Sequence, residues 1–159
     1  TDTISVFLRN SSSPYAIVDS ARSYLSASGS ATITFPNAVS GVGYYIQLKH
    51  RSSIETWSKT PQMFSANTLT YDFTSAVTQA FGDNLVQVDS SPVKYAVYSR
   101  DINQDGTVDA TDVSTIDNDA ANFVGGYVVT DLTGDNFVDG TDFAIADNSA
   151  ANFVSVVRP

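Results

Sequence analysis

The chain of 159 residues carries 17 Asp and Glu against 8 Lys and Arg, which gives a formal net charge of −9 with its single His neutral. Residues 1–100 are nearly balanced in charge, whereas residues 101–159 hold eleven Asp, no Glu and one base. Without a basic face, the chain is a poor binder of nucleic acid or of anionic membrane surfaces. Its 42% hydrophobic content is enough for a core and too high for a disordered acidic tail.

The sequence contains no Cys, which excludes disulfides, thiolate zinc sites and Cys nucleophiles. No apolar stretch approaches the roughly 18 residues that a membrane-spanning helix needs. Thr1 begins no leader-like pattern of charged and apolar residues. We therefore expect a mature or trimmed soluble chain.

Apolar and polar residues alternate in short runs across the first hundred residues, with turn residues between the runs. This pattern is typical of a β-sandwich, so we expect an N-terminal β-sandwich domain over residues 1–98. One or two helical turns are expected between Ser75 and Phe81. The expected strands cover residues 3–8, 15–18, 31–35, 44–50, 54–57, 68–73, 85–88 and 93–98.

One part of this region shows the order strand, Gly turn, alternating strand: Ile33–Val39, then Gly41 and Gly43, then Tyr44–Lys49. In this order it resembles the carboxypeptidase regulatory-like β-sandwiches, also called transthyretin-like, of secreted bacterial proteins. The resemblance covers less than a quarter of the region. It implies a structural or binding module without catalysis.

The acidic part of the chain is a duplication. Residues 101–124 and 131–154 align without gaps at an offset of 30, with 13 of 24 pairs identical. In each copy, Asp occupies loop positions 1, 5, 9 and 12, where a twelve-residue loop presents oxygen ligands to calcium. The expected ligands of two Ca²⁺ ions are Asp101, Asn103, Asp105, the carbonyl of Thr107, Asp109 and Asp112 in the first loop, and Asp131, Thr133, Asp135, the carbonyl of Phe137, Asp139 and Asp142 in the second.

Two other loop positions support this interpretation. Gly106 at position 6 allows the sharp turn, and Val108 at position 8, with its copy Val138, is expected to pair the two loops through a β-bridge while its side chain enters the core. The second loop has Thr133 for Asn103 and Asn136 for Gly106, so we expect its site to be weaker. Asn is the residue that best tolerates the left-handed conformation after Gly.

Alternatives to calcium are a metal-free pair of Asp-rich turns and magnesium, which prefers a rigid octahedron with retained waters. Soft metals lack a ligand set, because there is no Cys and His50 lies outside the repeat. Both loops end in Asp rather than Glu. The backbone at position 12 must therefore come closer for that carboxylate to chelate with both oxygens.

A helical pattern follows each loop. Thr111 or Asp112 is expected to cap a helix that reaches about Phe123. The apolar face comprises Val113, Ile116, Ala120 and Phe123 in the first copy and Phe143, Ala146, Ala150 and Phe153 in the second. After Gly125 and Gly126, residues 127–129 are expected to form a strand, and residues 155–157 resemble them. Such returning strands would pair with the β domain.

Two loop-helix units with the pattern D-x-N-x-D-G-x-V-D-x-x-D and a close copy resemble a dockerin, over residues 101–157 of a second domain at 99–159. A β-sandwich before a dockerin is also similar to the X-module and dockerin pairs of cellulosome proteins. The resemblance implies an extracellular or cell-surface protein of bacterial type that binds a cohesin-like partner, in either of two orientations. The partner-binding residues that it implies are Ala110, Thr111, Asp117, Asn118 and Asn122, with Gly140, Thr141, Asp147, Asn148 and Asn152 in the copy.

A structural subunit of an extracellular fibre or surface layer, made of copies of the chain and rigidified by calcium, is the alternative function. Catalysis is not expected, because the only cluster of catalytic residue types is His50, Arg51, Glu55 and Trp57, and no Ser lies in a G-x-S-x-G elbow. Tyr44, Tyr45 and Trp57 would offer a platform for glycan contact. Asn10 begins a glycosylation sequon of low specificity.

Overall fold

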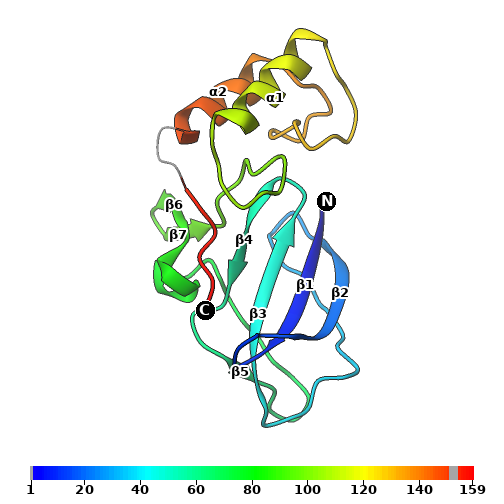
Figure 1. Cartoon of the computed structure of the whole chain (residues 1–159), viewed down its shortest axis with the longest axis vertical. Coiled ribbons are helices and arrows are strands. Elements are labelled where there is room, and N and C mark those ends of the chain that lie inside the picture. The colour runs from blue at the N-terminus through cyan, green and yellow to red at the C-terminus, as the bar shows by residue number, and fades with distance from the viewer. Residues whose placement is uncertain (1, 151–153) are drawn as a thin grey trace. The chain divides into compact units, whose positions relative to one another are not determined.

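The computed structural model describes residues 2–150 and 154–159 (Figure 1), without the side chains of residues 147–150. The chain divides into two compact units. Unit 1 comprises Thr1–His50, Glu55–Val97 and Val157–Pro159, and unit 2 comprises Arg51–Ile54 and Tyr98–Val156. Two antiparallel sheets and two short α-helices confirm a mainly β chain with a small α part. In the described part of the chain, no helix has the length and apolar character to cross a membrane.

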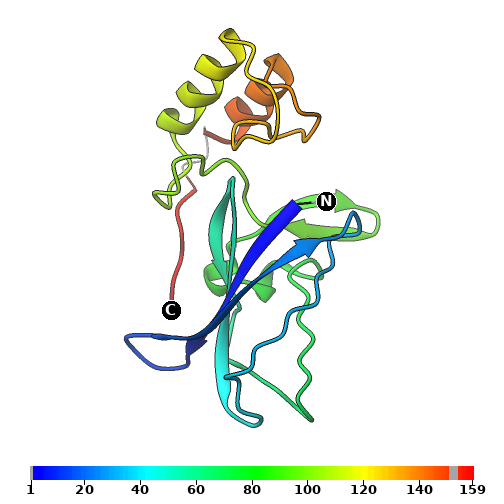
Figure 2. The same cartoon turned by 90° about the vertical axis from the view of Figure 1, so that its right-hand side faces the viewer.

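The larger sheet has the strand order β2-β1-β3-β4, and β5 pairs with β3 (labelled in Figure 1; Figure 2 shows the chain turned by 90°). Its strands are β1 (Asp2–Asn10), β2 (Ile17–Leu25), β3 (Gly43–His50), β4 (Ser53–Trp57) and β5 (Gln62–Met63). β1 is antiparallel to both neighbours, and its register with β3 places Ile4 opposite His50 and Leu8 opposite Ile46. Because side chains alternate along a strand, one face of β1 and β3 is continuously apolar.

That face carries the core of unit 1. Its buried members are Ile4, Val6, Leu8, Tyr44 and Ile46. Half-buried side chains from outside the sheet, such as Ile33, Phe35, Leu69 and Phe73, pack against them. The apolar alternation seen in the sequence thus predicts this core correctly.

Two of the expected strands, residues 31–35 and 68–73, are wrong. Both segments lie outside the named strands, and of their backbone only Thr68 makes a bridge, to Ser65. Their alternating side chains do pack on the sheet, so the apolar pattern reflects burial without a hydrogen-bonded ladder. The other strands of the larger sheet are close to expectation, except that β2 begins at Ile17 and continues to Leu25 and that β5 was not expected.

The rest of unit 1 is a small hairpin and two helical turns. The hairpin consists of β6 (Val86–Ser90) and β7 (Val93–Ala96), and the turns are 3₁₀ segments at Val77–Gln79 and Phe81–Asp83. Helical turns in this part of the chain are therefore confirmed.

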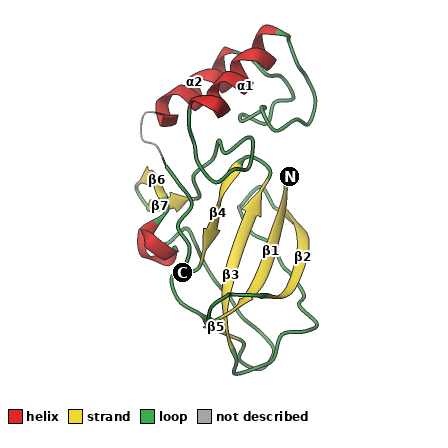
Figure 3. Cartoon of the chain, viewed as in Figure 1, coloured by secondary structure: helices red, strands yellow, loops and turns green. Residues whose placement is uncertain are grey.

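Unit 2 contains α1 (Ala110–Ala121) and α2 (Gly140–Ala150), drawn in red in Figure 3. The expected cap of α1 is wrong by two or three residues, because Asp109 is the N-cap. Its side chain accepts from the Thr111 N–H at 2.7 Å, and Asp112 returns the interaction by accepting the Asp109 N–H at 3.0 Å. This reciprocal capping box satisfies N–H groups that a helix start leaves unpaired.

The helices pack through the expected apolar faces, with Ile116 and Ala146 fully buried. Phe123 is an exception, since it is 86% exposed. The helix has already ended at Ala121, and Phe123 has φ +53, which removes it from the helical face. Its copy Phe153 lies outside the described residues. Residues 127–129 do not form the expected strand but lie in bends and turns.

Candidate metal centre

The first loop is closed by hydrogen bonds from its own backbone to its acidic and amide side chains. The Gly106 N–H donates to Asp101 Oδ2 at 3.1 Å, the Asp105 N–H donates to Asn103 Oδ1 at 2.9 Å, and the Thr107 N–H donates to Asp105 Oδ1 at 2.9 Å. Each of these side chains therefore has a fixed direction relative to the loop. Three of the expected ligands, at positions 1, 3 and 5, are held around one turn.

The second loop repeats this scaffold at the same positions. The Asn136 N–H donates to Asp131 Oδ2 at 3.1 Å, and the Phe137 N–H donates to Asp135 Oδ1 at 2.9 Å. The left-handed turn at position 6 is present in both copies, with φ +90 at Gly106 and +71 at Asn136. The expectation that Asn136 preserves the turn is confirmed.

The carboxylate at position 12 fastens both ends of each loop. Asp112 is completely buried, and its Oδ1 accepts the N–H groups of Ile102 and Asn103 at 2.8 and 3.3 Å. In the second loop Asp142 accepts from Leu132 and Thr133 at 2.8 and 2.9 Å. Oδ2 of each carboxylate accepts one N–H, from Asp109 or Asp139, and keeps a further lone pair for a cation. Chelation of a cation by both oxygens stays a prediction.

One atom of the first loop has no partner. Asp101 is 2% exposed, and its Oδ1 accepts no hydrogen bond from any residue that the structure describes. Burial, together with the negative charges of Asp112 and Asp105, raises the pKa of Asp101 to about 6, although the hydrogen bond from the Gly106 N–H lowers it. Buried carboxylate oxygens are normally hydrogen-bonded or bound to a cation. The first loop therefore fits a hard cation at Asp101 Oδ1.

The equivalent atom of the second loop is already engaged. Asp131 Oδ1 accepts the Gly134 N–H at 2.7 Å and the Thr133 hydroxyl at 3.3 Å. The difference comes from the sequence, because Thr133 replaces Asn103 and Gly134 replaces Gln104. A cation at the second loop has to share Asp131 Oδ1 with these two donors.

Position 4 was missed by the sequence analysis. Gln104 has φ +59 and its Nε2 donates to the Asp101 carbonyl at 2.6 Å, while the equivalent Gly134 has φ +77. Both loops thus turn left-handed at position 4 as well as at position 6. The Gly at 134 is the signal that would have shown this.

The β-bridge expected between the two loops is wrong, because each loop pairs with another segment. Val108 and Val138 are buried at 1% exposure each, as expected, but neither pairs with the other loop. The Val108 N–H donates to the Val154 carbonyl at 2.8 Å, and the Val138 N–H donates to the Val124 carbonyl at 2.9 Å. Each loop therefore pairs with the segment that follows the helix of the other copy.

This exchange is reciprocal along its whole length. Thr107 bridges with Ser155 and Phe137 bridges with Gly125, both antiparallel. The Val156 N–H donates to the Gly106 carbonyl and the Gly126 N–H to the Asn136 carbonyl, each at 2.8 Å. Ser155 and Val156 therefore pair with the first loop, which is a different partner from the β domain expected from the sequence. The two copies cannot be separated without breaking these ladders.

The outer ligand positions face solvent. Asn103, Asp105, Asp135 and Asp139 are exposed, and Asp109 is half-buried. Among the residues with described side chains, no three acidic or His groups lie close enough together to form a metal site. The structure thus brings the loop backbones and position 12 into place, and convergence of the outer carboxylates stays a prediction.

The implied partner-binding surface is accessible in the first copy. Ala110, Thr111, Asp117, Asn118 and Asn122 are all exposed. In the second copy Gly140 and Thr141 are exposed as well. The side chains of Asp147 and Asn148, and all of Asn152, lie outside what the structure describes.

The predicted glycan platform in unit 1 is wrong. Tyr44 and Trp57 are only 3% and 4% exposed, so neither presents a ring face to a sugar.

His50 pairs with Asp2 at 2.9 Å. Glu55 accepts hydrogen bonds from Trp57 Nε1 at 2.6 Å and from Arg158 Nε at 2.8 Å.

These donors control the charge of Glu55. Burial alone would raise its pKa, but hydrogen bonds from Arg158, Trp57 and Lys49 outweigh burial and lower the pKa to about 2. Glu55 is therefore a structural ion-pair partner, held ionised by its neighbours.

None of three comparisons, with models of protein families, with curated proteins and with solved structures, gives a match. The evidence for a function therefore comes from the loops themselves. They share a repeated scaffold of hydrogen bonds, and among the described residues Asp101 Oδ1 is a buried carboxylate oxygen without a partner.

Proposed function

We propose that unit 2 binds two Ca²⁺ ions and serves as an extracellular, non-catalytic module for attachment to a protein partner. Asp101 Oδ1 is the observation that carries the calcium assignment, because it is a buried carboxylate oxygen without a partner among the described residues. The side chains that would hold the first ion are Asp101, Asn103, Asp105, Asp109 and Asp112, with the Thr107 carbonyl. Bound calcium would supply the positive charge that this acidic loop lacks.

Several features support calcium over magnesium. Each loop offers carboxylate, amide or hydroxyl, and carbonyl oxygens, a set that suits the six to eight ligands and flexible geometry of Ca²⁺. Magnesium keeps several waters and needs a nearly ideal octahedron. The second site should be weaker, since Asp131 Oδ1 already accepts two hydrogen bonds.

The attachment function rests on the exposed helix surface. Thr111, Asp117 and Asn118 on α1, with Asn122 at its C-cap, are exposed polar residues that would meet a cohesin-like protein. The helices carrying this surface start at the loops, where Asp109 and Asp112 form the cap of α1. Calcium binding would therefore order the surface as it orders the loop.

A thermal melt of the full chain in calcium, in magnesium and in chelator tests the metal assignment. We expect calcium to raise the melting temperature of unit 2 strongly, because a ligand that binds only the folded state stabilises it by mass action. Magnesium should raise it less. A melting temperature that does not respond to calcium would contradict the assignment.

A fibre or surface-layer subunit is the second candidate. One feature favours it: Val88 and Val93 of the β6–β7 hairpin are 62% and 48% exposed, and in the described chain β6 has no strand neighbour besides β7. An open edge with exposed apolar side chains is suited to pairing between copies. Size-exclusion chromatography in calcium distinguishes the two functions, since attachment predicts a monomer and the fibre predicts polymers.

A further inference from the structure

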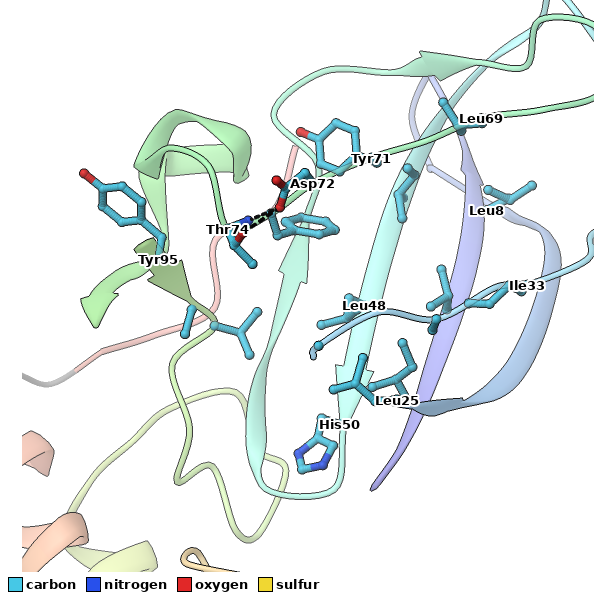
Figure 4. A pocket seen from close by; sticks show the side chains of 18 of the residues that line it. Leu8, Leu25, Ile33, Leu48, His50, Leu69, Tyr71, Asp72, Thr74 and Tyr95 are labelled. Atoms are coloured by element: carbon cyan, nitrogen blue, oxygen red, sulfur yellow. Dashed lines mark hydrogen bonds between the residues drawn. The ribbon is translucent and has the colours of Figure 1, made fainter. Parts of the chain in front are cut away.

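Unit 1 contains a partly open apolar cavity of about 450 Å³ (Figure 4). Its floor is the apolar face of the larger sheet, formed by Ile4, Val6, Leu8, Ile46 and Leu48. The cavity lies within the 300–1,000 Å³ range of small-molecule sites. A far smaller cavity of about 150 Å³ with an aliphatic and aromatic lining stays dry and takes up benzene. The volume in unit 1 is therefore suited to a larger apolar molecule.

The roof of the cavity differs from its floor. It is formed by Ile33, Phe35, Leu69 and Phe73, which lie on segments without strand assignment. The floor residues Val6 and Leu8 are 5% and 1% exposed, whereas every one of these roof residues is only half-buried. The roof thus packs toward the sheet without filling the space above it. Side chains that line a void lose the contacts that close packing would give them, and an apolar ligand would restore those contacts.

The register of the sheet gives the shape of the cavity. From Ile4, opposite His50, to Leu8, opposite Ile46, the floor extends four residues along β1, which is about 14 Å at 3.4 Å per residue. Spread over that length, a volume of about 450 Å³ has a mean width of about 6 Å. A single alkyl chain lying along the strands fits these dimensions.

The polar groups at the borders of the cavity include His50 at the end of β3, Asp72 and Thr74 in the roof, and the lining residues Tyr71 and Tyr95 (Figure 4). His50 Nε2 lies 2.9 Å from Asp2 Oδ2. Asp72 Oδ1 accepts from the Thr74 N–H and hydroxyl at 2.7 and 2.8 Å, and Lys94 Nζ donates to the same hydroxyl at 3.3 Å. His50 and Asp72 each already have a partner within unit 1, so neither is left to pair with a charged head group.

The geometry points to a binding site for an amphiphile with one alkyl chain and an uncharged polar head, in unit 1 and separate in function from the calcium loops. The chain lies on the floor between Ile4 and Leu8. The head lies at a polar border, where it exchanges hydrogen bonds with His50 or Thr74. This activity is a ligand-binding one and involves no chemical step.

Titration of the full chain in calcium buffer with decan-1-ol tests the site, with methyl NMR and calorimetry as readouts. We expect saturable binding of one molecule and shifts concentrated on the methyl groups of Val6, Leu8, Ile46 and Leu48. Decanoate and decyltrimethylammonium should bind roughly tenfold more weakly or worse, since burying an unpaired charge is unfavourable. The absence of saturable decan-1-ol binding would overturn the proposal, as would equal affinity for all three head groups.

Two variants locate the ligand. Ala96→Phe places a large side chain at a half-buried lining position, and Ile33→Ser makes the roof polar; each should weaken decan-1-ol binding at least tenfold. Ala16→Phe is the matched control, because Ala16 is exposed and does not line the cavity, so its affinity should equal that of the parent. If Ala96→Phe does not fold, Ile33→Ser decides alone. Unchanged binding in the folded variants, or binding of an extended apolar peptide but not decan-1-ol, contradicts the proposal.

Discussion

The two loops of unit 2 have the same hydrogen-bonded scaffold but differ at one atom. In both, position 1 accepts from the backbone N–H of position 6 and position 12 fastens the loop ends. Only in the first loop does the second oxygen of position 1, Asp101 Oδ1, lack a partner; Asp131 Oδ1 accepts from Gly134 and Thr133. The two copies thus share the hydrogen bonds that shape the loop. They differ in whether the second oxygen of position 1 is available to a cation.

The largest loss of stability is expected at position 12, where the two loops make the same hydrogen bonds. Asp112→Ala and Asp142→Ala each remove a fully buried carboxylate that holds three backbone N–H groups. Because each buried N–H left unpaired costs about 1–3 kcal/mol, either variant should lose roughly 3 kcal/mol or more of unit 2 stability. Denaturant unfolding followed by far-UV circular dichroism measures this loss. If only one of the two variants lost stability, the hydrogen-bonded scaffolds of the two loops would not be equivalent.

Glu55 contrasts with Asp101, because both oxygens of its buried carboxylate accept hydrogen bonds. Its pKa is lowered from 4.5 to about 2. A lowered pKa in the folded state adds stability that is complete above the unfolded pKa and disappears as the pH falls from about 4.5 to about 2. The parent should therefore be about 2 kcal/mol more stable than Glu55→Gln at neutral pH.

Fluorescence of Trp57, the single Trp, follows unit 1 in that measurement. The stability difference between the parent and Glu55→Gln should shrink steadily below pH 4.5. A difference that stays constant down to pH 2 would show that the ion pairs of Glu55 do not stabilise the fold.

The effect of an Asn substitution on the stability of unit 2 should change sign between chelator and calcium at Asp101 but not at Asp131. In chelator, Asp101→Asn should stabilise unit 2 by about 1 kcal/mol, because it removes a buried negative charge that no cation balances; in calcium it should destabilise by about 2 kcal/mol. Asp131→Asn should destabilise under both conditions by about 1–2 kcal/mol, since the single amide oxygen can replace only one of the two carboxylate oxygens that accept the Gly134 and Asn136 N–H groups. Thermal melts of both variants in both buffers give the four values. Identical behaviour of the two variants would remove the contrast between the loops.

The smallest effects are expected at position 6. Gly106→Asn should cost about 1 kcal/mol, because φ is +90 and an added Cβ would lie 3.0 Å from Val156 Cγ1. The reverse change, Asn136→Gly, should gain a few tenths of a kcal/mol at φ +71. Chemical denaturation of the pair measures both. If Gly106→Asn stabilised unit 2 and Asn136→Gly destabilised it, the left-handed turn would not limit the stability of either loop.

The sequence was sufficient where the pattern is local. Loop length, the turn at Asn136 and the burial of Val108 follow from spacing within one copy, and the sheet core follows from alternation along β1 and β3. It was insufficient where partners are distant in the chain. The pairing of Val108 with Val154 joins opposite copies, and the segments at 31–35 and 68–73 alternate without a ladder. The engagement of Asp131 Oδ1 depends on the conformation of Gly134, which spacing does not specify.

Calcium titration of the full chain by calorimetry, for the parent, Asp101→Asn and Asp131→Asn, tests whether both loops bind calcium and whether their affinities differ. We expect two ions per chain in the parent, with the tighter site lost in Asp101→Asn and the weaker site lost in Asp131→Asn. No calcium binding by the parent, or an isotherm that neither substitution changes, would contradict this expectation.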